Sequence, residues 1–131
     1  MNIAKSFVEY MEDEGFGTFG TDIFIGVAPQ NAPDPCYWLT TSGGSPESRN
    51  DTGEVIKIYT INLYYRNTDA EDVYNKMQEL EVELNKANCT QLNGFDTIQL
   101  SATLFPTDQD IDNEERTVGI IEVTVKTYYK E

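Results

Sequence analysis

The sequence predicts an α+β fold in which two helices pack on a mixed, mainly antiparallel sheet of about five strands. Apolar residues alternate in several segments, which is typical of half-buried strands. In two other segments they recur every three to four positions, which is typical of amphipathic helices. The length of 131 residues suits one domain, and eight Tyr and six Phe favour a folded core. We therefore expect residues 1–131 to form a single domain.

The first predicted helix covers residues 2–14. One face carries its apolar residues, which are Ile3, Phe7, Val8 and Met11. Asn2 is a suitable N-cap, because its side chain can accept a hydrogen bond from a free backbone N–H of the first turn. Gly15 can end the helix, because glycine tolerates the left-handed backbone that often follows a helix.

Two strands and a loop are expected next. Residues 22–28 alternate, with Ile23, Ile25 and Val27 on one side, and residues 36–41 form a second strand around Trp38 and Leu39. Residues 42–53 contain almost nothing apolar, so we expect a mobile polar loop there.

The longest predicted strand covers residues 54–66 and is apolar on both sides. One side carries Tyr59, Ile61, Leu63 and Tyr65, and the other carries Ile56, Ile58 and Tyr64. Such a strand needs cover on both faces. Either a helix packs on each face or a partner subunit covers one of them.

The second predicted helix covers residues about 69–87. Thr68 and Glu71 have the spacing of a capping box, in which Thr68 bonds forward and Glu71 bonds back. The apolar face of this helix contains Val73, Met77, Leu80 and Leu84.

The end of the chain predicts an antiparallel hairpin. Residues 97–105 alternate with Ile98, Leu100, Ala102 and Leu104 inward, and residues 117–129 alternate with Ile121, Val123, Val125 and Tyr129 inward. The acidic segment 107–115 connects them.

The net charge of −14 excludes several partners. Nine basic residues against 23 acidic ones leave no cationic footprint for nucleic acid, and an anionic membrane surface would repel the chain. Nothing approaches a membrane-spanning apolar run or a signal peptide, so we expect synthesis in a cytoplasm and no membrane partner. The charge either serves solubility or forms a functional acidic surface.

The chain lacks the usual residues of a catalytic site. It has no His, which removes the commonest general base near neutral pH and the commonest metal ligand. Cys36 and Cys89 are expected to be reduced core residues, and no nucleophile elbow or phosphate loop occurs. We expect no enzymatic activity, no cofactor and no metal centre.

Alternating acids in residues 108–112 resemble the start of a calcium loop. That pattern requires Gly at position 6 and Glu at position 12, where this chain has Asn113 and Gly119. Weak calcium binding remains an alternative to a solvated acidic hairpin tip.

The order of the elements and their pattern of apolar and polar residues resemble those of the tail terminator, or tail-to-head joining, proteins of phages with long non-contractile tails. The stretches that carry this resemblance are Ile-Tyr-Thr-Ile-Asn-Leu-Tyr-Tyr-Arg at 58–66, Pro-Asp-Pro-Cys-Tyr-Trp-Leu at 33–39 and Gly-Ile-Ile-Glu-Val-Thr-Val-Lys-Thr-Tyr-Tyr at 119–129. The resemblance covers nearly the whole chain and is architectural.

The resemblance implies a structural virion protein at the head–tail junction. Its subunits would form a ring, a hexamer in the family, that caps the tail tube and contacts the tube protein and the head connector, with DNA passing through unbound. An acidic lumen would repel DNA, and the candidates for it are Asp108, Asp110, Asp112, Glu114 and Glu115. The candidates for the subunit interface are Ile56, Ile58, Tyr64, Arg49 and Arg66.

Two other functions remain open at this point. One is a different head–tail connector or completion subunit. The other is an acidic DNA mimic that inhibits a nucleic-acid enzyme, although the acids gather in loops and Glu79, Glu81 and Glu83 do not form one helix stripe.

Overall fold

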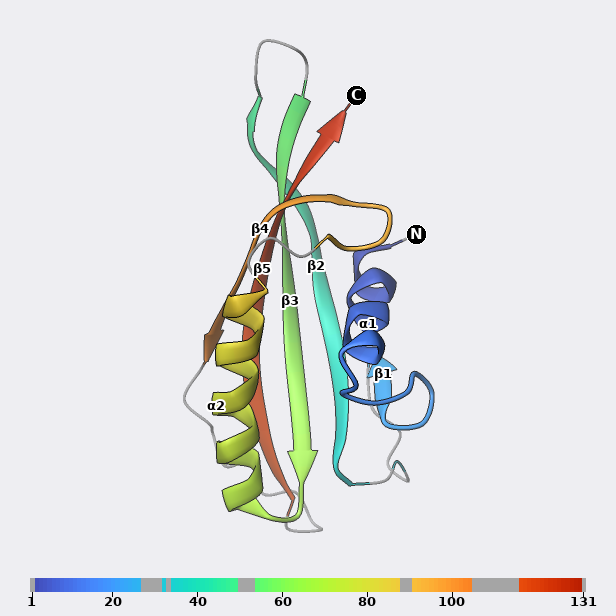
Figure 1. Cartoon of the computed structure of the whole chain (residues 1–131), viewed down its shortest axis with the longest axis vertical. Helices are drawn as coiled ribbons and strands as arrows, with labels where there is room; N and C mark the ends of the chain where they lie inside the picture. Colours follow the sequence, from blue (N-terminus) through green and yellow to red (C-terminus); the bar gives the residue numbers. More distant parts are fainter. Residues whose placement is uncertain are drawn as a thin grey trace.

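A computed structural model shows, in the residues that it describes, two helices and a five-stranded mixed sheet, which confirms the predicted fold class. The structure describes residues 2–26, 32, 34–49, 54–87, 91–104 and 116–130. The strand order in the sheet is β1-β2-β3-β5-β4, and Figure 1 shows the strands running along the length of the molecule.

The first helix, α1 (Ile3–Asp13), begins where the sequence predicts. The backbone N–H of Lys5 donates to the side-chain oxygen of Asn2 at 2.8 Å, which confirms the N-cap. Gly15 lies two residues beyond the helix with φ of +83°, a left-handed conformation that glycine adopts without steric cost.

The second helix, α2 (Ala70–Lys86), has a different cap from the predicted one. The side chain of Asp69, and not that of Thr68, accepts hydrogen bonds from the backbone N–H groups of Glu71 and Asp72. The N–H of Thr68 donates to the side chain of Asn67 at 2.8 Å. A short carboxylate reaches the first-turn amides directly and suits the positive end of the helix dipole, so the helix begins one residue later.

The central strand is β3 (Glu54–Asn67), which pairs in antiparallel fashion with β2 (Cys36–Arg49) and β5 (Thr117–Lys130). The last strand pair, β4 (Asp96–Leu104) with β5, confirms the predicted hairpin. A shift in register between Thr97 and Gln99 places Thr97 inside, where strict alternation from Leu100 would have exposed it.

The prediction of a loop over residues 42–53 is wrong for residues 42–49. These residues continue β2 and pair with β3 as far as Arg49 opposite Val55, with two shifts in register on the way. A strand is held by backbone hydrogen bonds, so polar side chains do not prevent it where the partner strand is long enough. In Figure 1 the far ends of β2, β3 and β5 extend together beyond both helices. Residues 50–53 lie outside the described residues.

The strand β1 (Ile23–Ile25) is shorter than the predicted 22–28 and runs parallel to β2. Ile23 is fully buried, whereas Ile25 is 40% exposed, so this short strand is covered at its start and accessible to solvent at its end. The strand ends because Gly26, with φ of +94°, turns the chain after its N–H has bonded the carbonyl of Leu39. Val27 lies outside the described residues.

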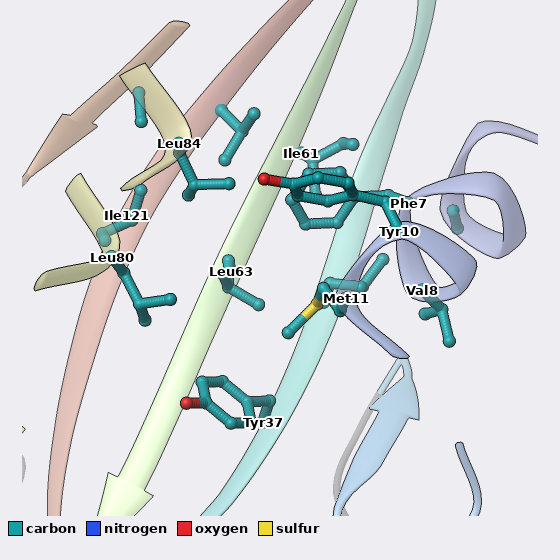
Figure 2. Packing of buried hydrophobic residues seen from close by; sticks show 14 of the residues in the cluster. Phe7, Val8, Tyr10, Met11, Tyr37, Ile61, Leu63, Leu80, Leu84 and Ile121 are labelled. Carbon is teal, nitrogen blue, oxygen red and sulfur yellow. The ribbon is translucent and has the colours of Figure 1, made fainter. Parts of the chain in front are cut away.

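The core lies on one face of the sheet, beneath both helices (Figures 1 and 2). Phe7 and Met11 of α1 and Leu80 and Leu84 of α2 are at most 1% exposed and belong to the same cluster as Leu63. From the sheet the cluster takes alternate residues, which are Tyr37, Leu39, Ile61, Leu63, Tyr65, Leu100, Ala102, Ile121, Val123 and Val125. Neither described helix packs on the opposite face, so the idea of one helix on each face is wrong.

Candidate interaction surface

The face of the sheet that points away from the helices is the candidate site, and we call it the open face. The edge strand β4 contributes Gln99, Ser101 and Thr103 to it. Between the row of Tyr128 and the row of Trp38, alternation along β2, β3 and β5 places twelve further described side chains on it. They are Trp38, Thr40, Ile56, Ile58, Thr60, Asn62, Tyr64, Ile120, Glu122, Thr124, Lys126 and Tyr128. Tyr128 is exposed and the other eleven are half-buried, in contrast to the fully buried residues of the covered face.

An aromatic pair forms one end of the open face. Trp38 and Tyr64 are partners across β2 and β3, and their rings stack with centroids 5.1 Å apart and an interplanar angle of 5°. Ile120 is the partner of Tyr64 on β5, so the three side chains form one row across three strands. This row is a flat apolar platform that is partly accessible to solvent.

The middle and the other end of the open face differ in polarity. Pairs in the middle are polar, with Asn62 opposite Glu122 and Thr60 opposite Thr124. Further along, Ile58 lies opposite Lys126 and Ile56 lies opposite Tyr128. Among these twelve side chains Glu122 and Lys126 are the charged ones and have opposite signs, so this described part of the open face has no net charge in a chain of charge −14.

Beyond the aromatic pair, an ion cluster closes the face. The Nε of Arg66 lies 2.8 Å from one carboxylate oxygen of Asp34, and the guanidinium of Arg116 lies 3.6 Å from the other. Both arginine side chains are 7% exposed, and Arg66 also donates to the carbonyl of Ala32 at 3.3 Å and lies 5.9 Å above the Trp38 ring. The segment around Asp34 is thereby held against the end of β3.

Cys36 lies within this closed end and is fully buried. Burial raises the pKa of its thiol, although the neighbouring Arg66 acts in the opposite direction. The thiol is a free one that stays protonated at neutral pH, which suits a packing role. Cys89 lies outside the described residues.

The structure places the predicted interface residues in different surroundings. Ile56, Ile58 and Tyr64 lie on the open face, with the two isoleucines near one end and Tyr64 at the other. Arg66 is buried and paired within the chain. The backbone of Arg49 pairs with Val55 at the far end of β2.

Sequence reasoning missed Trp38, Ile120 and Tyr128 as members of this surface. Each belongs to the less apolar side of its own strand, so no single strand reveals the row. The cross-strand register of β2 and β5 against β3 brings them beside the predicted residues. Alternation in residues 117–129 was the available signal, because the inward set leaves Ile120 and Tyr128 on the other side.

Neither a metal-ligand cluster nor a membrane-spanning helix is found among the described residues. No group of three or more His, Cys, Asp or Glu side chains that could hold a metal ion occurs among them. No helix in the described part of the chain is long and apolar enough to cross a membrane.

Comparison with known proteins decides the family. A family model described as bacteriophage tail terminator protein matches residues 10–129, which is nearly the whole chain. The chain belongs to this phage tail terminator family. The resemblance stated from the sequence is therefore confirmed.

The fold of the terminator chain is similar to that of a known virion component. A chain in the virion of a native gene transfer agent particle superposes with a TM-score of 0.62 over 96% of each chain, at 8% identity. At that identity the similarity shows the fold alone. A search of curated proteins found no match.

Two of the predictions from the sequence concern residues that the structure does not describe. The predicted acidic tip, which consists of Asp108, Asp110, Asp112, Glu114 and Glu115, lies outside the described residues, and so does the alternative calcium site formed by the first four of these residues. The tip therefore stays a prediction, and the open face is the candidate surface that rests on described side chains.

Proposed function

We propose that this chain is a non-enzymatic ring subunit that caps the phage tail tube and joins it to the head connector. Membership of the tail terminator family supports a structural role in the virion tail. The observation that supports a ring subunit is the open face, because a sheet face with a half-buried aromatic platform is suited to contact with a partner. The copy number, a hexamer by the resemblance, and the named contacts are part of the proposal.

The composition of the open face supports contact between copies of the chain. Protein interfaces are enriched in Trp and Tyr, and the open face carries Trp38, Tyr64 and Tyr128. Two copies that each carry −14 repel one another, so a close approach favours surfaces without net charge. On the open face the negative charge of Glu122 is balanced by the positive charge of Lys126, which lies four residues further along β5.

A substitution at the centre of the open face tests this contact. Thr60→Arg places a long cation on the half-buried face between Ile58 and Asn62, so copies that pack through it should separate. The matched control is Thr21→Arg, which makes the same change at an exposed turn residue before β1. Mass-resolved chromatography and negative-stain microscopy at high protein concentration, with and without the tube protein of the same phage, provide the measurement.

The expected result is rings, alone or at the ends of tubes, for the wild type and for Thr21→Arg. Thr60→Arg should remain folded by circular dichroism and form no ring. Rings of normal size from folded Thr60→Arg would exclude the open face as the contact. A wild-type chain that neither forms rings nor binds tube ends would contradict the terminator role itself, and inhibition of a nuclease by such a chain would favour the DNA mimic.

The role proposed for the acidic tip rests on the sequence alone. We propose that Asp108, Asp110, Asp112, Glu114 and Glu115 face the channel through which DNA slides. Like charges would keep phosphates from binding the wall, and a charge of −14 per copy favours this arrangement. Replacing the five acids by Lys in an assembled phage should slow DNA passage, and unchanged infectivity would count against it.

A further inference from the structure

The outer edge of β4 makes hydrogen bonds with side chains where a neighbouring strand would otherwise bond. The side-chain oxygen of Gln91 accepts from the backbone N–H of Thr97 at 3.0 Å. The side-chain nitrogen of Gln91 donates to the carbonyl of the same Thr97 at 2.9 Å. One amide side chain thus makes both bonds that a paired strand residue would make.

Asn85 does the same five residues further along β4. Its side-chain oxygen accepts from the N–H of Ala102 at 2.9 Å, and its side-chain nitrogen donates to the carbonyl of Ala102 at 3.1 Å. The same nitrogen also donates to the carbonyl of Glu81, one turn earlier in α2, at 2.9 Å, which fixes the orientation of the amide. The amide of Asn85 is therefore held in place from both sides.

Glu81 is the third side chain that bonds this edge. Its carboxylate accepts from the N–H of Leu104 at 3.0 Å. Thr97, Ala102 and Leu104 direct these backbone groups away from β5, on the side where a sixth strand would add. Five backbone hydrogen bonds of this edge are thus made by three side chains.

The placement of α2 explains how three side chains reach one strand edge. The helix packs over β4 and β5, and Glu81 and Asn85 lie one turn apart on it. Gln91 follows the end of the helix, where the chain turns back into β4, and the N–H of Leu92 donates to the side chain of Thr97 at 3.4 Å. The arrangement runs along the strand from near its start to its last residue.

We propose that Glu81, Asn85 and Gln91 close the outer edge of β4 against pairing with β4 of a second copy. An exposed strand edge is a template for another strand, and two identical edges can pair in antiparallel fashion about a twofold axis. Such a pair would be a closed dimer with no role in a ring. This inference goes beyond the proposed function and does not depend on it.

The second copy is the relevant partner because its edge has the same length and direction of hydrogen bonds. Strand addition depends on backbone groups, which every copy presents identically. The side chains of the three closing residues are short and remain attached to the chain. They therefore occupy these backbone groups at a much higher effective concentration than a second molecule can provide.

The test is the triple variant Glu81→Ala, Asn85→Ala and Gln91→Ala, made together with Thr60→Arg so that contacts through the open face do not contribute. The single variant Asn85→Ala in the same background serves if the triple variant does not fold. Asn75→Ala is the matched control, since it makes the same change on an exposed position of α2. Chromatography with light scattering over a range of concentrations reports self-association, and amide hydrogen exchange reports the edge.

We expect the amides of Thr97, Ala102 and Leu104 to exchange about two- to tenfold faster in the dilute triple variant, the factor that one net hydrogen bond supplies. At high concentration the triple variant should form dimers in which those amides are protected again, whereas Asn75→Ala stays like its background. Faster exchange without any dimer would overturn the proposal. Unchanged exchange would overturn it as well, because the three side chains would then not be holding the edge.

Discussion

Leu63 and Tyr64 are neighbours in β3 and point to opposite faces of one sheet. Leu63 is fully buried under two helices, whereas Tyr64 is half-buried and stacks on Trp38. The covered face stabilises the fold by removing apolar side chains from water. The open face removes less apolar area from water and therefore contributes less to the stability of the fold. The four predictions below test this division of roles, from the largest expected effect to the smallest.

Breaking the ion cluster of Asp34, Arg66 and Arg116 should have the largest effect on the free energy of unfolding. Asp34→Ala leaves Arg66 and Arg116 buried without the shared carboxylate, and removing one partner of a buried ion pair typically costs about 3–5 kcal/mol. Urea unfolding measures the free energy of unfolding. Asp13→Ala, at the exposed end of α1, is the control and should be nearly neutral. A cost for Asp34→Ala as small as that of the control would mean that the cluster does not hold this end of the sheet.

The neighbouring pair on β3 compares the two faces directly. Leu63→Ala should lower the free energy of unfolding by about 2–5 kcal/mol, because it removes a fully buried side chain and leaves a cavity. Tyr64→Ala should cost about 1 kcal/mol in the isolated subunit, mainly through the lost stacking with Trp38. Both are measured by urea unfolding of the monomer. Equal costs would show that the open face is as important to folding as the core.

Gly119 of β5 packs directly against Met77 and Val73 of α2. A Cβ at this position would collide with the Cγ of Met77 and lie 2.6 Å from its sulfur and 3.1 Å from Val73. Gly119→Ala should therefore cost about 1–3 kcal/mol, the usual range for overpacking a core. Thermal unfolding provides the measurement. In a chain that already carries Met77→Ala, which removes the obstructing side chain, the further cost of Gly119→Ala should be smaller. A neutral Gly119→Ala would mean that α2 can move away from the sheet without cost.

Alkaline pH should weaken the covered face through its tyrosines. Burial is the main cause that raises the pKa of Tyr37 and Tyr65 above the ordinary value of 10.0, and Tyr65 also donates to the carboxylate of Asp72 at 2.6 Å. Folding thus favours the neutral phenols. Their contribution is complete below pH 10 and is lost as the pH rises above it, towards the raised pKa values of the folded chain.

Urea midpoints between pH 8 and pH 11 measure this loss. Tyr65→Phe removes one of the ionising groups, so its stability should fall less steeply with pH than that of the wild type. The same slope in both proteins would show that Tyr65 does not contribute to the alkaline loss. Stability at pH 7 is a separate quantity, because Tyr65→Phe also loses the hydrogen bond to Asp72.

Much of the fold could be predicted because it depends on local patterns. The alternation in residues 54–66 and 117–129 correctly separated the two faces of β3 and β5, and the 3.6-residue period identified both helices. Residues 42–49 could not be predicted as a strand, because their pairing depends on the length of β3 and not on their own side chains. The cap of α2 was misplaced by one residue, because Thr68 and Asp69 are both suitable caps in sequence.

The sequence by itself determined the fold class, the acidic charge and the phage tail family, because these follow from composition and residue order along the chain. The tertiary structure decided which face of the sheet remains open, because both helices pack on the same side. The tertiary structure also decided which partners individual polar residues bind. Arg66 became part of a buried cluster and Asn85 became a partner of β4, since each reaches its partner only after the strands and helices have assembled.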